Sequence, residues 1–188
     1  MRKLIVTEFM TLDGVVEAPH EWSFPYWNDD IARFKLDEIM TSDILLLGRV
    51  TYDGFAAAWP NRENDEAGFT EKINTMPKYV ASNSLKTADW NNTRIIRANL
   101  IEEVRQLKQQ DGGFIMVAGS PNLIQTLVRE GQVDEFWLLV YPIVLYHGKR
   151  LFYNGSEPTS AGPLKLKLNE VRSIGSGVIL QRYETERA

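Results

Sequence analysis

The sequence predicts an α/β protein of three layers, in which helices cover both faces of a mainly parallel central sheet and an antiparallel hairpin lies near the C-terminus. The first observation is that short, mostly apolar runs alternate with helical patterns from Leu4 to Tyr141, which is typical of parallel strands buried on both faces. The second is that leucine alternates with polar residues from Lys165 to Ser173, and a further run follows the turn residues Gly175 and Ser176. Alternation around such a turn predicts an antiparallel hairpin.

The individual elements follow from hydrophobic periodicity and from capping and turn residues. Asn99, with Glu102 three residues later, predicts a capping box at the start of one helix. Another helix has Ser120 at its cap position, Pro121 at its first position and Gly131 just past its end. The predicted strands are Leu4–Met10, Ile44–Leu47, Tyr79–Ala81, Arg94–Ile96, Phe114–Val117 and Phe136–Tyr141, with a hairpin of Lys165–Ser173 and Gly177–Tyr183. The predicted helices are Asp30–Met40, Glu66–Asn74, Leu100–Gln109 and Pro121–Glu130.

Composition indicates a globular chain that needs no metal or disulfide to fold. The 188 residues are 44% hydrophobic and 24% charged, which fits a single domain over residues 1–188. The sequence has no cysteine, which excludes thiol chemistry and suits the reducing cytoplasm. No apolar stretch approaches the length of a bilayer span, and Glu8 interrupts the N-terminal run before it could form a signal-peptide core. We therefore expect a cytoplasmic protein with no membrane partner.

Charge and histidine usage exclude two further classes of partner. The net charge is −4 and the sequence has no block of Lys and Arg, so no nucleic-acid partner is expected. His20 and His147 have no second ligand at helix or turn spacing, so no metal site is expected.

Two strand ends run into helix starts through glycine, a pattern that suits phosphate binding. Leu45–Tyr52 contains Gly48, Arg49 and Thr51, and helix N-terminal amides with an arginine nearby attract phosphate. A strand-to-helix turn with a surface arginine explains the same residues. Val117–Leu123 contains Gly119, Ser120, Asn122 and Leu123, whose amides can hold a second part of a pyrophosphate. Ser120 alternatively serves only as a helix cap.

Two other segments carry polar or aromatic groups after strands. Ser82, Asn83 and Ser84 can hydrogen-bond an adenosine phosphate, although they also suit an ordinary turn. Asp13 can orient a substrate or relay a proton, whereas an Asp-Gly turn is the alternative. The loop after it contains aromatic residues that can enclose a planar heterocycle or belong to a core or dimer contact. These aromatic residues are Trp22, Phe24, Tyr26 and Trp27.

Together these segments resemble the dihydrofolate reductase superfamily, in which the chain is closest to the RibD C-terminal domain family of riboflavin biosynthesis proteins. The resemblance is carried, in order, by Thr11–Gly14, Leu45–Tyr52, Val80–Leu85, Met116–Leu123 and Val133–Leu145. It implies a dihydrofolate reductase-like fold and NADPH as cofactor. It also implies that Gly48, Arg49 and Thr51 contact the phosphates, that Ser82–Ser84 approach the adenosine, and that Gly119 and Ser120 touch the pyrophosphate. Relatives usually have a Gly-Gly pair at the last position.

Asp30 is a second candidate for the catalytic acid. Trp27–Lys35 resembles the helix that bears the substrate-binding acid of true dihydrofolate reductases. A solvated acid that stabilises the first turn of its helix is the alternative.

The resemblance implies an NADPH-dependent reductase of a small heterocycle, similar to 5-amino-6-(5-phosphoribosylamino)uracil reductase. We expect hydride transfer with Asp13, Asp30 or an ordered water supplying the proton. Trp22, Phe24 and Tyr26 are expected to line the substrate pocket. The alternatives are a dihydrofolate reductase and a non-catalytic nucleotide-binding or interaction module. The aromatic loop and the apolar run Phe136–Leu145 predict a homodimer.

Overall fold

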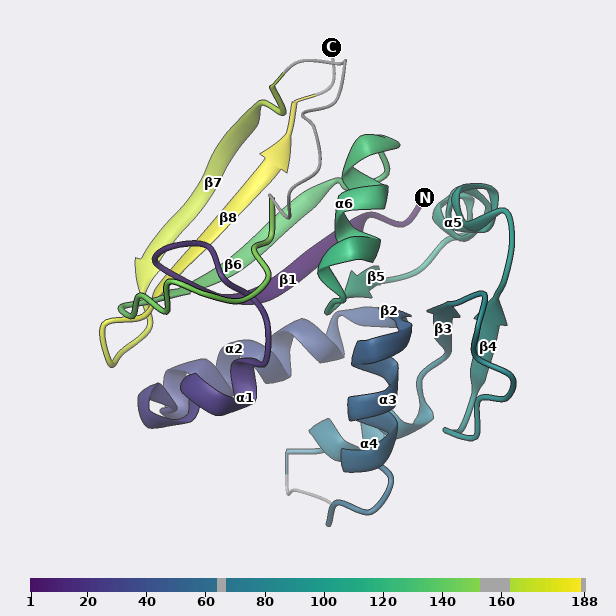
Figure 1. Cartoon of the computed structure of the whole chain (residues 1–188), viewed down its shortest axis with the longest axis horizontal. Helices are drawn as coiled ribbons and strands as arrows, with labels where there is room; N and C mark the ends of the chain where they lie inside the picture. Colours follow the sequence, from purple (N-terminus) through teal and green to yellow (C-terminus); the bar gives the residue numbers. More distant parts are fainter. Residues whose placement is uncertain (64–66, 153–162, 187–188) are drawn as a thin grey trace.

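A computed structural model describes residues 1–63, 67–152 and 163–186. It contains an eight-stranded sheet with the strand order β4-β3-β2-β5-β1-β6-β8-β7 (Figure 1). The strands are β1 (Leu4–Thr11), β2 (Ser42–Gly48), β3 (Lys78–Ala81), β4 (Thr93–Ile96), β5 (Phe114–Val117), β6 (Glu135–Tyr141), β7 (Leu166–Ser173) and β8 (Ile179–Thr185).

Strands β1 to β6 pair in parallel, and β1 lies near the middle of the sheet between β5 and β6. β8 pairs antiparallel with β6, and β7 pairs antiparallel with β8, which makes β7 one edge of the sheet. The predicted fold class, a mainly parallel sheet with a C-terminal antiparallel hairpin, is therefore confirmed. Because β1 to β6 are parallel, the segments that follow them leave from the same edge of the sheet, which we call the carboxyl edge.

Helices cover both faces of this sheet (Figure 1). One face packs against residues of α2, α3 and α4, and the other against residues of α5 and α6. The helices are α1 (Pro19–Trp22), the 3₁₀ helix η1 (Phe24–Tyr26), α2 (Asp29–Met40), α3 (Arg49–Ala58), α4 (Phe69–Thr75), α5 (Leu100–Gln109) and α6 (Pro121–Arg129). Within these described ranges, no helix is both long and apolar enough to cross a bilayer.

Alternation along β1 explains why the chain buries two apolar clusters. Ile5 packs into the cluster beneath α2, whereas Leu4 and Val6 pack into the cluster beneath α5 and α6. Side chains of a strand point alternately to the two faces of the sheet. By the same alternation, Glu8 lies on the α6 face with Val6, although it is a carboxylic acid.

The structure differs from the predicted elements mainly at helix starts. Asn99 adopts a left-handed conformation and makes no side-chain cap bond, so the predicted capping box is wrong. Asn28 caps α2 instead, since its side chain accepts hydrogen bonds from the amides of Asp30 and Ile31. α4 begins at Phe69, and the predicted start of this helix, Glu66, lies outside the described residues. Ser120 stands at the cap position of α6, but its side chain makes no cap bond either.

The apolar run that predicted a homodimer is a central strand. Phe136–Tyr141 forms most of β6, and Phe136, Leu139 and Tyr141 are fully buried within one chain. Its hydrophobicity is thus explained without a second copy, and the homodimer stays a prediction.

Candidate functional site

Two strand-to-helix turns meet at the carboxyl edge. β2 and β5 are neighbours, with Leu46 opposite Val117, so the residues after each strand emerge side by side. The amide of Gly48 donates a hydrogen bond to the carbonyl oxygen of Gly119 across 3.1 Å. The predicted phosphate-binding segments are therefore in direct contact.

Glycine at two of these positions allows the close approach. A Cβ atom added to Gly48 would lie 2.1 Å from Ser120 Oγ and 3.0 Å from the Ser120 nitrogen. A Cβ atom added to Gly119, whose φ is +98°, would lie 2.7 Å from Thr51 Oγ1. We call Gly48, Thr51, Gly119 and Ser120 the glycine junction. The peptide bond between Gly119 and Ser120 is cis.

The glycine junction brings together the N-termini of two helices. α3 starts at Arg49 and α6 at Pro121, and neither N-cap residue, Gly48 or Ser120, gives a side-chain hydrogen bond to the first turn. Amides in the first turn of a helix lack partners within the helix, and they carry the positive end of the helix dipole. The first turns of α3 and α6, with their amides, therefore begin on either side of one contact.

The remaining predicted cofactor residues near α3 and α6 differ in exposure. The guanidinium of Arg49 pairs with Asp53 at 2.9 Å, and both side chains are 47% exposed. Asn122 is exposed. Leu123 is buried in the cluster beneath α6, so its side chain belongs to the core and only its backbone amide can serve a ligand.

Ser82–Ser84 also lie at the carboxyl edge, directly after β3. Ala81 pairs with Gly48, which places Ser82 beside the start of α3. Ser82 Oγ accepts hydrogen bonds from the amides of Ser84 and Leu85, at 3.3 and 3.0 Å, so it forms a local turn. Asn83 and Ser84 are exposed. The turn alternative is therefore realised, and the adenosine role of this segment stays a prediction.

Asp13 holds two loops together. Its carboxylate accepts hydrogen bonds from Thr11 Oγ1 at 2.7 Å and from the amides of Leu145 and Tyr146 at 3.2 and 3.0 Å. Arg150 lies 3.6 Å from the same carboxylate. The hydrogen bond from Thr11 is the main cause that lowers the pKa of Asp13, with the two amides contributing. Asp13 thus joins the loop after β1 to the loop after β6, and its catalytic role stays a prediction.

The predicted substrate-binding aromatic residues are unequal in exposure. Trp22 is buried and stands edge-on to Tyr141, with ring centroids 5.3 Å apart. Tyr26 is partly buried and contacts the same ring at 5.7 Å. Phe24 is 66% exposed. Trp22 therefore belongs to the core, whereas Phe24 and Tyr26 have surface to offer a ligand.

Asp30 lies at the exposed start of α2. Its carboxylate forms a surface ion pair with Arg33 at 3.1 Å, and 54% of its side chain is exposed. The solvated alternative describes this geometry well, since an acid in the first turn stabilises the helix N-terminus. Its catalytic role is not supported by a buried partner and stays a prediction.

Sequence reasoning missed Glu8 as a candidate. Glu8 is 8% exposed, and its Oε1 atom is buried without a hydrogen-bond partner among the described residues. Burial raises the pKa of Glu8 to about 8; Lys35 opposes this rise and Glu38 adds to it. Oε1 lies 3.5 Å from the point where a Cβ of Gly119 would be. The available signal was a single charged residue in a mostly apolar strand, on the same face as Leu4 and Val6.

A second buried acid, Glu38, has its charge compensated. Glu38 Oε1 accepts a hydrogen bond from Thr7 Oγ1 at 2.5 Å, and its other oxygen pairs with Lys35. The Lys35 ammonium also lies 5.5 Å from the centroid of the Phe9 ring. This network ties α2 to β1 on the face opposite to Glu8.

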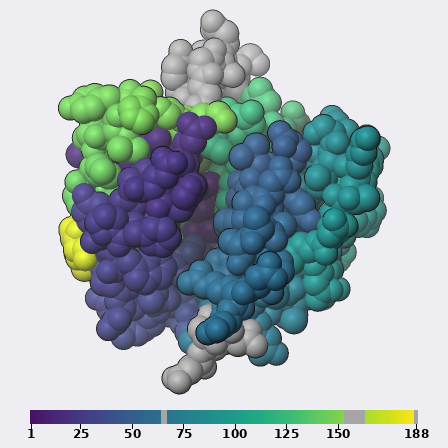
Figure 2. Space-filling view, turned by 60° about the horizontal axis from the view of Figure 1, so that its bottom comes forward, coloured from purple at the N-terminus to yellow at the C-terminus, as the bar shows by residue number. Residues whose placement is uncertain are grey.

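The surface view shows a groove beside the carboxyl edge of the sheet (Figure 2). It runs between the purple segment that follows β1 and the blue residues of α3. Its two walls therefore belong to the aromatic loop region on one side and to the helix that starts at the glycine junction on the other.

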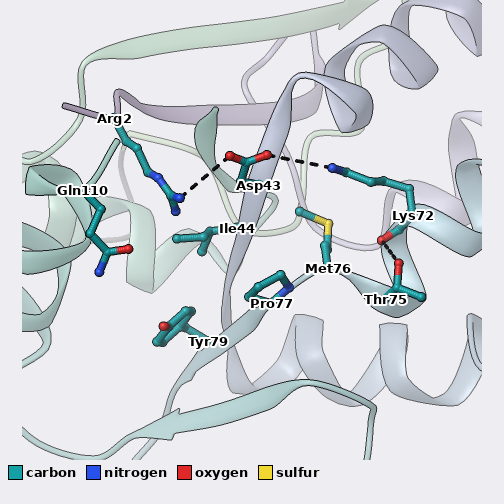
Figure 3. Close-up of a pocket in the computed structure, with 9 residues that line it drawn as sticks. All are labelled: Arg2, Asp43, Ile44, Lys72, Thr75, Met76, Pro77, Tyr79 and Gln110. Atoms are coloured by element: carbon teal, nitrogen blue, oxygen red, sulfur yellow. Dashed lines mark hydrogen bonds and ion pairs between the residues drawn. The ribbon is translucent and has the colours of Figure 1, made fainter. Parts of the chain in front are cut away.

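A separate pocket of about 380 Å³ lies at the amino ends of the parallel strands, opposite the carboxyl edge (Figure 3). Arg2 and Lys72 both approach the carboxylate of Asp43, at 3.8 and 4.0 Å, from the two sides of the pocket. None of the predicted site residues lines it. Within the described ranges, no group of three or more His, Cys, Asp or Glu residues is placed to hold a metal ion.

Comparison with solved structures supports this fold. A pyrimidine reductase-like protein from Corynebacterium diphtheriae superposes with a TM-score of 0.71 at 14% identity, covering 100% of this chain and 93% of that one. A deaminase/5-amino-6-(5-phosphoribosylamino)uracil reductase from Thermotoga maritima gives 0.65 at 17% identity, over 98% of this chain and 56% of that one. Dihydrofolate reductase from Enterococcus faecalis, complexed with NADP(H), gives 0.58 at 15% identity, over 98% and 97%. The fold is therefore dihydrofolate reductase-like.

Sequence comparison identifies the family. The uncharacterized protein YyaP of Bacillus subtilis is 32% identical over 184 residues, which cover 95% of this chain and 92% of YyaP. The family model of the RibD C-terminal domain matches residues 2–180. The chain therefore belongs to the RibD C-terminal domain family.

Proposed function

We propose that the protein binds NADPH at the glycine junction and reduces a small heterocyclic substrate in the adjoining groove. The observation that carries this proposal is the contact between the N-termini of α3 and α6, fastened by the hydrogen bond from Gly48 to Gly119. Two uncapped helix N-termini at one point favour a dianionic group such as a pyrophosphate.

The residues of the junction fit such a group in their chemistry. A side chain at Gly48 would meet Ser120 and one at Gly119 would meet Thr51, so the glycines let the two turns approach each other and bring the hydroxyls of Ser120 and Thr51 to the contact. Arg49 is half-exposed and only one residue from the junction, so its guanidinium can leave Asp53 for a phosphate at little cost. Bound NADPH supplies a hydride, and the residues of this chain bind and orient the reactants.

The substrate class is proposed from the neighbourhood of the groove. Asp13 braces the loop after β1, and Phe24 and Tyr26 from that region have surface available for a planar ring. The family and the Thermotoga maritima neighbour favour a pyrimidine over a pterin. The exposed position of Asp30 does not favour a true dihydrofolate reductase, since such an acid is expected inside the substrate pocket.

A non-catalytic nucleotide-binding module is the second candidate. It is favoured by the placement of both predicted acids, because the carboxylate of Asp13 is engaged by three donors and that of Asp30 faces solvent. This candidate shares cofactor binding with the first and lacks turnover.

A fluorescence titration with NADPH and with NADH tests cofactor binding before any substrate is known. The protein has five tryptophans to report on it. We expect saturable quenching by NADPH and weaker binding of NADH, because the junction can hold the pyrophosphate of either dinucleotide and Arg49 favours the additional phosphate of NADPH. Consumption of NADPH with a pyrimidine ribosyl substrate would then support the reductase, whereas binding without consumption over pyrimidine and pterin substrates would support the module. Absence of binding would contradict both.

A further inference from the structure

Glu8 places an ionisable group directly beside the proposed anion site. Its Oε1 atom is 3.5 Å from the point that a Cβ on Gly119 would occupy, and Thr51 Oγ1 is 2.7 Å from the same point. Glu8 therefore borders the glycine junction on the side of β1. None of the sequence motifs includes it.

The surroundings of Glu8 do not neutralise a negative charge by contact. Oε1 has no hydrogen-bond partner among the residues that the structure describes, and Glu8 shares its sheet face with apolar Val6 and Val117. An ionised carboxylate in such a site is unfavourable unless it is paired. Burial accordingly raises the pKa of Glu8 to about 8.

The charged side chains to consider are those of α2, which act on Glu8, and those of α3 and α6, the two helices that start at the junction. On α2, Lys35 favours ionisation of Glu8 and Glu38 opposes it, and these two side chains pair with each other. On α3, Arg49 pairs with Asp53 at the surface. On α6, the charged side chain is Arg129 in the last turn, at the far end of the helix from the junction. Among the residues that the structure describes, none of Lys35, Arg49 and Arg129 forms an ion pair with Glu8.

We propose that Glu8 sets the charge of the glycine junction, so that an anionic dinucleotide binds well only while the Glu8 carboxyl carries a proton. This inference rests on the proposed function, since it concerns the same site. The amides at the starts of α3 and α6 can stabilise one negative charge at the junction. An ionised Glu8 and a bound pyrophosphate would compete for those amides and repel each other in a site of low dielectric constant. Glu8 is thus a residue that controls cofactor affinity rather than a proton donor to substrate.

The proposal predicts a specific dependence of NADPH affinity on pH. Only the fraction of protein with protonated Glu8 is competent to bind, so the apparent Kd rises as that fraction falls. With a pKa of about 8 for Glu8, the Kd for NADPH should rise roughly tenfold between pH 7 and pH 9. The phosphates of NADPH change little over this range, because the second pKa of a phosphate monoester is about 6 and such a group is already about nine-tenths ionised at pH 7.

The test is an NADPH fluorescence titration from pH 7 to pH 9.5 with the wild-type protein, Glu8→Gln and Glu102→Gln. Glu8→Gln keeps the shape of the side chain without the charge, so its Kd should stay constant within about twofold over the range. Glu102→Gln removes one exposed carboxylate from α5 and should reproduce the wild-type rise. Far-UV circular dichroism at each pH checks that each protein is folded.

Three outcomes would overturn the proposal. A wild-type Kd that does not change up to pH 9.5 would show that the charge of Glu8 does not reach the ligand, and this test needs no variant. An equal rise of the Kd in Glu8→Gln would show that another group causes the pH dependence. If none of the three proteins binds NADPH at any pH, the proposed function fails and this inference fails with it, whereas the first two outcomes leave NADPH binding intact.

Discussion

The amide of Gly48 donates a hydrogen bond to the carbonyl oxygen of Gly119 across 3.1 Å and fastens the start of α3 to the turn before α6. The two residues are far apart in the sequence, and parallel pairing of β2 with β5 brings them together. The separation of the two helix starts is therefore fixed by the sheet and leaves little room for side chains between them. This explains why small residues occupy the contact and why their replacement should affect binding and stability together.

Gly48→Ala should destabilise the protein and weaken NADPH binding. The added Cβ would stand 2.1 Å from Ser120 Oγ and 3.0 Å from the Ser120 nitrogen, so the turn before α6 has to move. The φ of Gly48 is −78°, which alanine adopts without strain, and the cost is therefore steric. Overpacking of this kind costs about 1–3 kcal/mol of unfolding free energy. Chemical denaturation and NADPH titration measure the two effects.

Two companion variants separate crowding from the general effect of alanine in α3. Gly54→Ala lies in the same helix with nothing within 4 Å of the new Cβ, and it should stabilise the protein by up to about 1 kcal/mol. Gly48→Ala combined with Ser120→Gly removes the contact with Oγ and should recover part of the lost stability. No recovery in the double variant would show that the clash does not involve the Ser120 side chain.

Arg49→Ala should weaken NADPH binding more than NADH binding, with little change in stability. Arg49 and Asp53 are both about half exposed, and an exposed ion pair contributes about 0–1 kcal/mol to folding. The lost guanidinium should instead matter to the additional phosphate of NADPH. Parallel titrations with both dinucleotides measure the difference. Equal losses for NADPH and NADH would remove Arg49 from the role of a ligand to the additional phosphate.

Asp53→Ala is the matched change on the other partner. It frees Arg49 from its ion pair without removing the guanidinium, so NADPH affinity should be unchanged or higher. A loss similar to that of Arg49→Ala would indicate that the pair acts by shaping α3 rather than by contacting phosphate.

Local signals in the sequence were sufficient for the strands β1 to β6 and for placing Gly48 and Gly119 at strand ends. Apolar runs predicted β1 to β6 to within two residues at each end, because their side chains are buried on both faces. Gly48 and Gly119 stood at strand ends before polar helix starts, and parallel pairing alone suffices to bring such ends to one edge. The sequence therefore predicts that the two segments lie near each other, but it does not predict the hydrogen bond between them.

Other features depend on partners that are distant in the sequence. The capping preference of asparagine applies equally to Asn28 and Asn99, yet only the side chain of Asn28 reaches the first-turn amides. Asp13 is engaged by the amides of Leu145 and Tyr146, which no local pattern around Asp13 could indicate. In the sequence Glu8 is evident only as an interruption of an apolar run, because its position beside Gly119 follows from the pairing of β1 with β5.

Asp13→Asn should loosen the loop after β6 and make the protein less stable near neutral pH. The carboxylate accepts hydrogen bonds at both oxygens and lies near Arg150, whereas asparagine has one acceptor oxygen and an amino group that cannot accept, so at least one of the three bonds is lost. The pKa of Asp13 is lowered in the folded state, chiefly by Thr11, so its stabilising contribution is present above the ordinary aspartate range and is lost as pH falls. The melting temperatures of variant and wild type should therefore differ less at pH 3 than at pH 7. A difference that does not shrink would exclude the charge as the cause.

Glu8→Gln should stabilise the protein progressively as pH rises. The folded-state pKa of about 8 exceeds the ordinary value of 4.5, so the folded protein retains a proton that the unfolded chain has lost. Ionisation of Glu8 in the unfolded chain therefore favours unfolding increasingly as pH rises from 4.5 to 8, so the contribution of protonated Glu8 to stability is full below pH 4.5 and is lost by about pH 8. The unfolding free energy of Glu8→Gln relative to wild type should thus increase by up to about 1.4 kcal/mol per pH unit between pH 5 and pH 8, and level off above. Urea denaturation at pH 5, 6.5, 8 and 9 measures it, and a constant difference across these four values would show that the Glu8 carboxyl titrates normally.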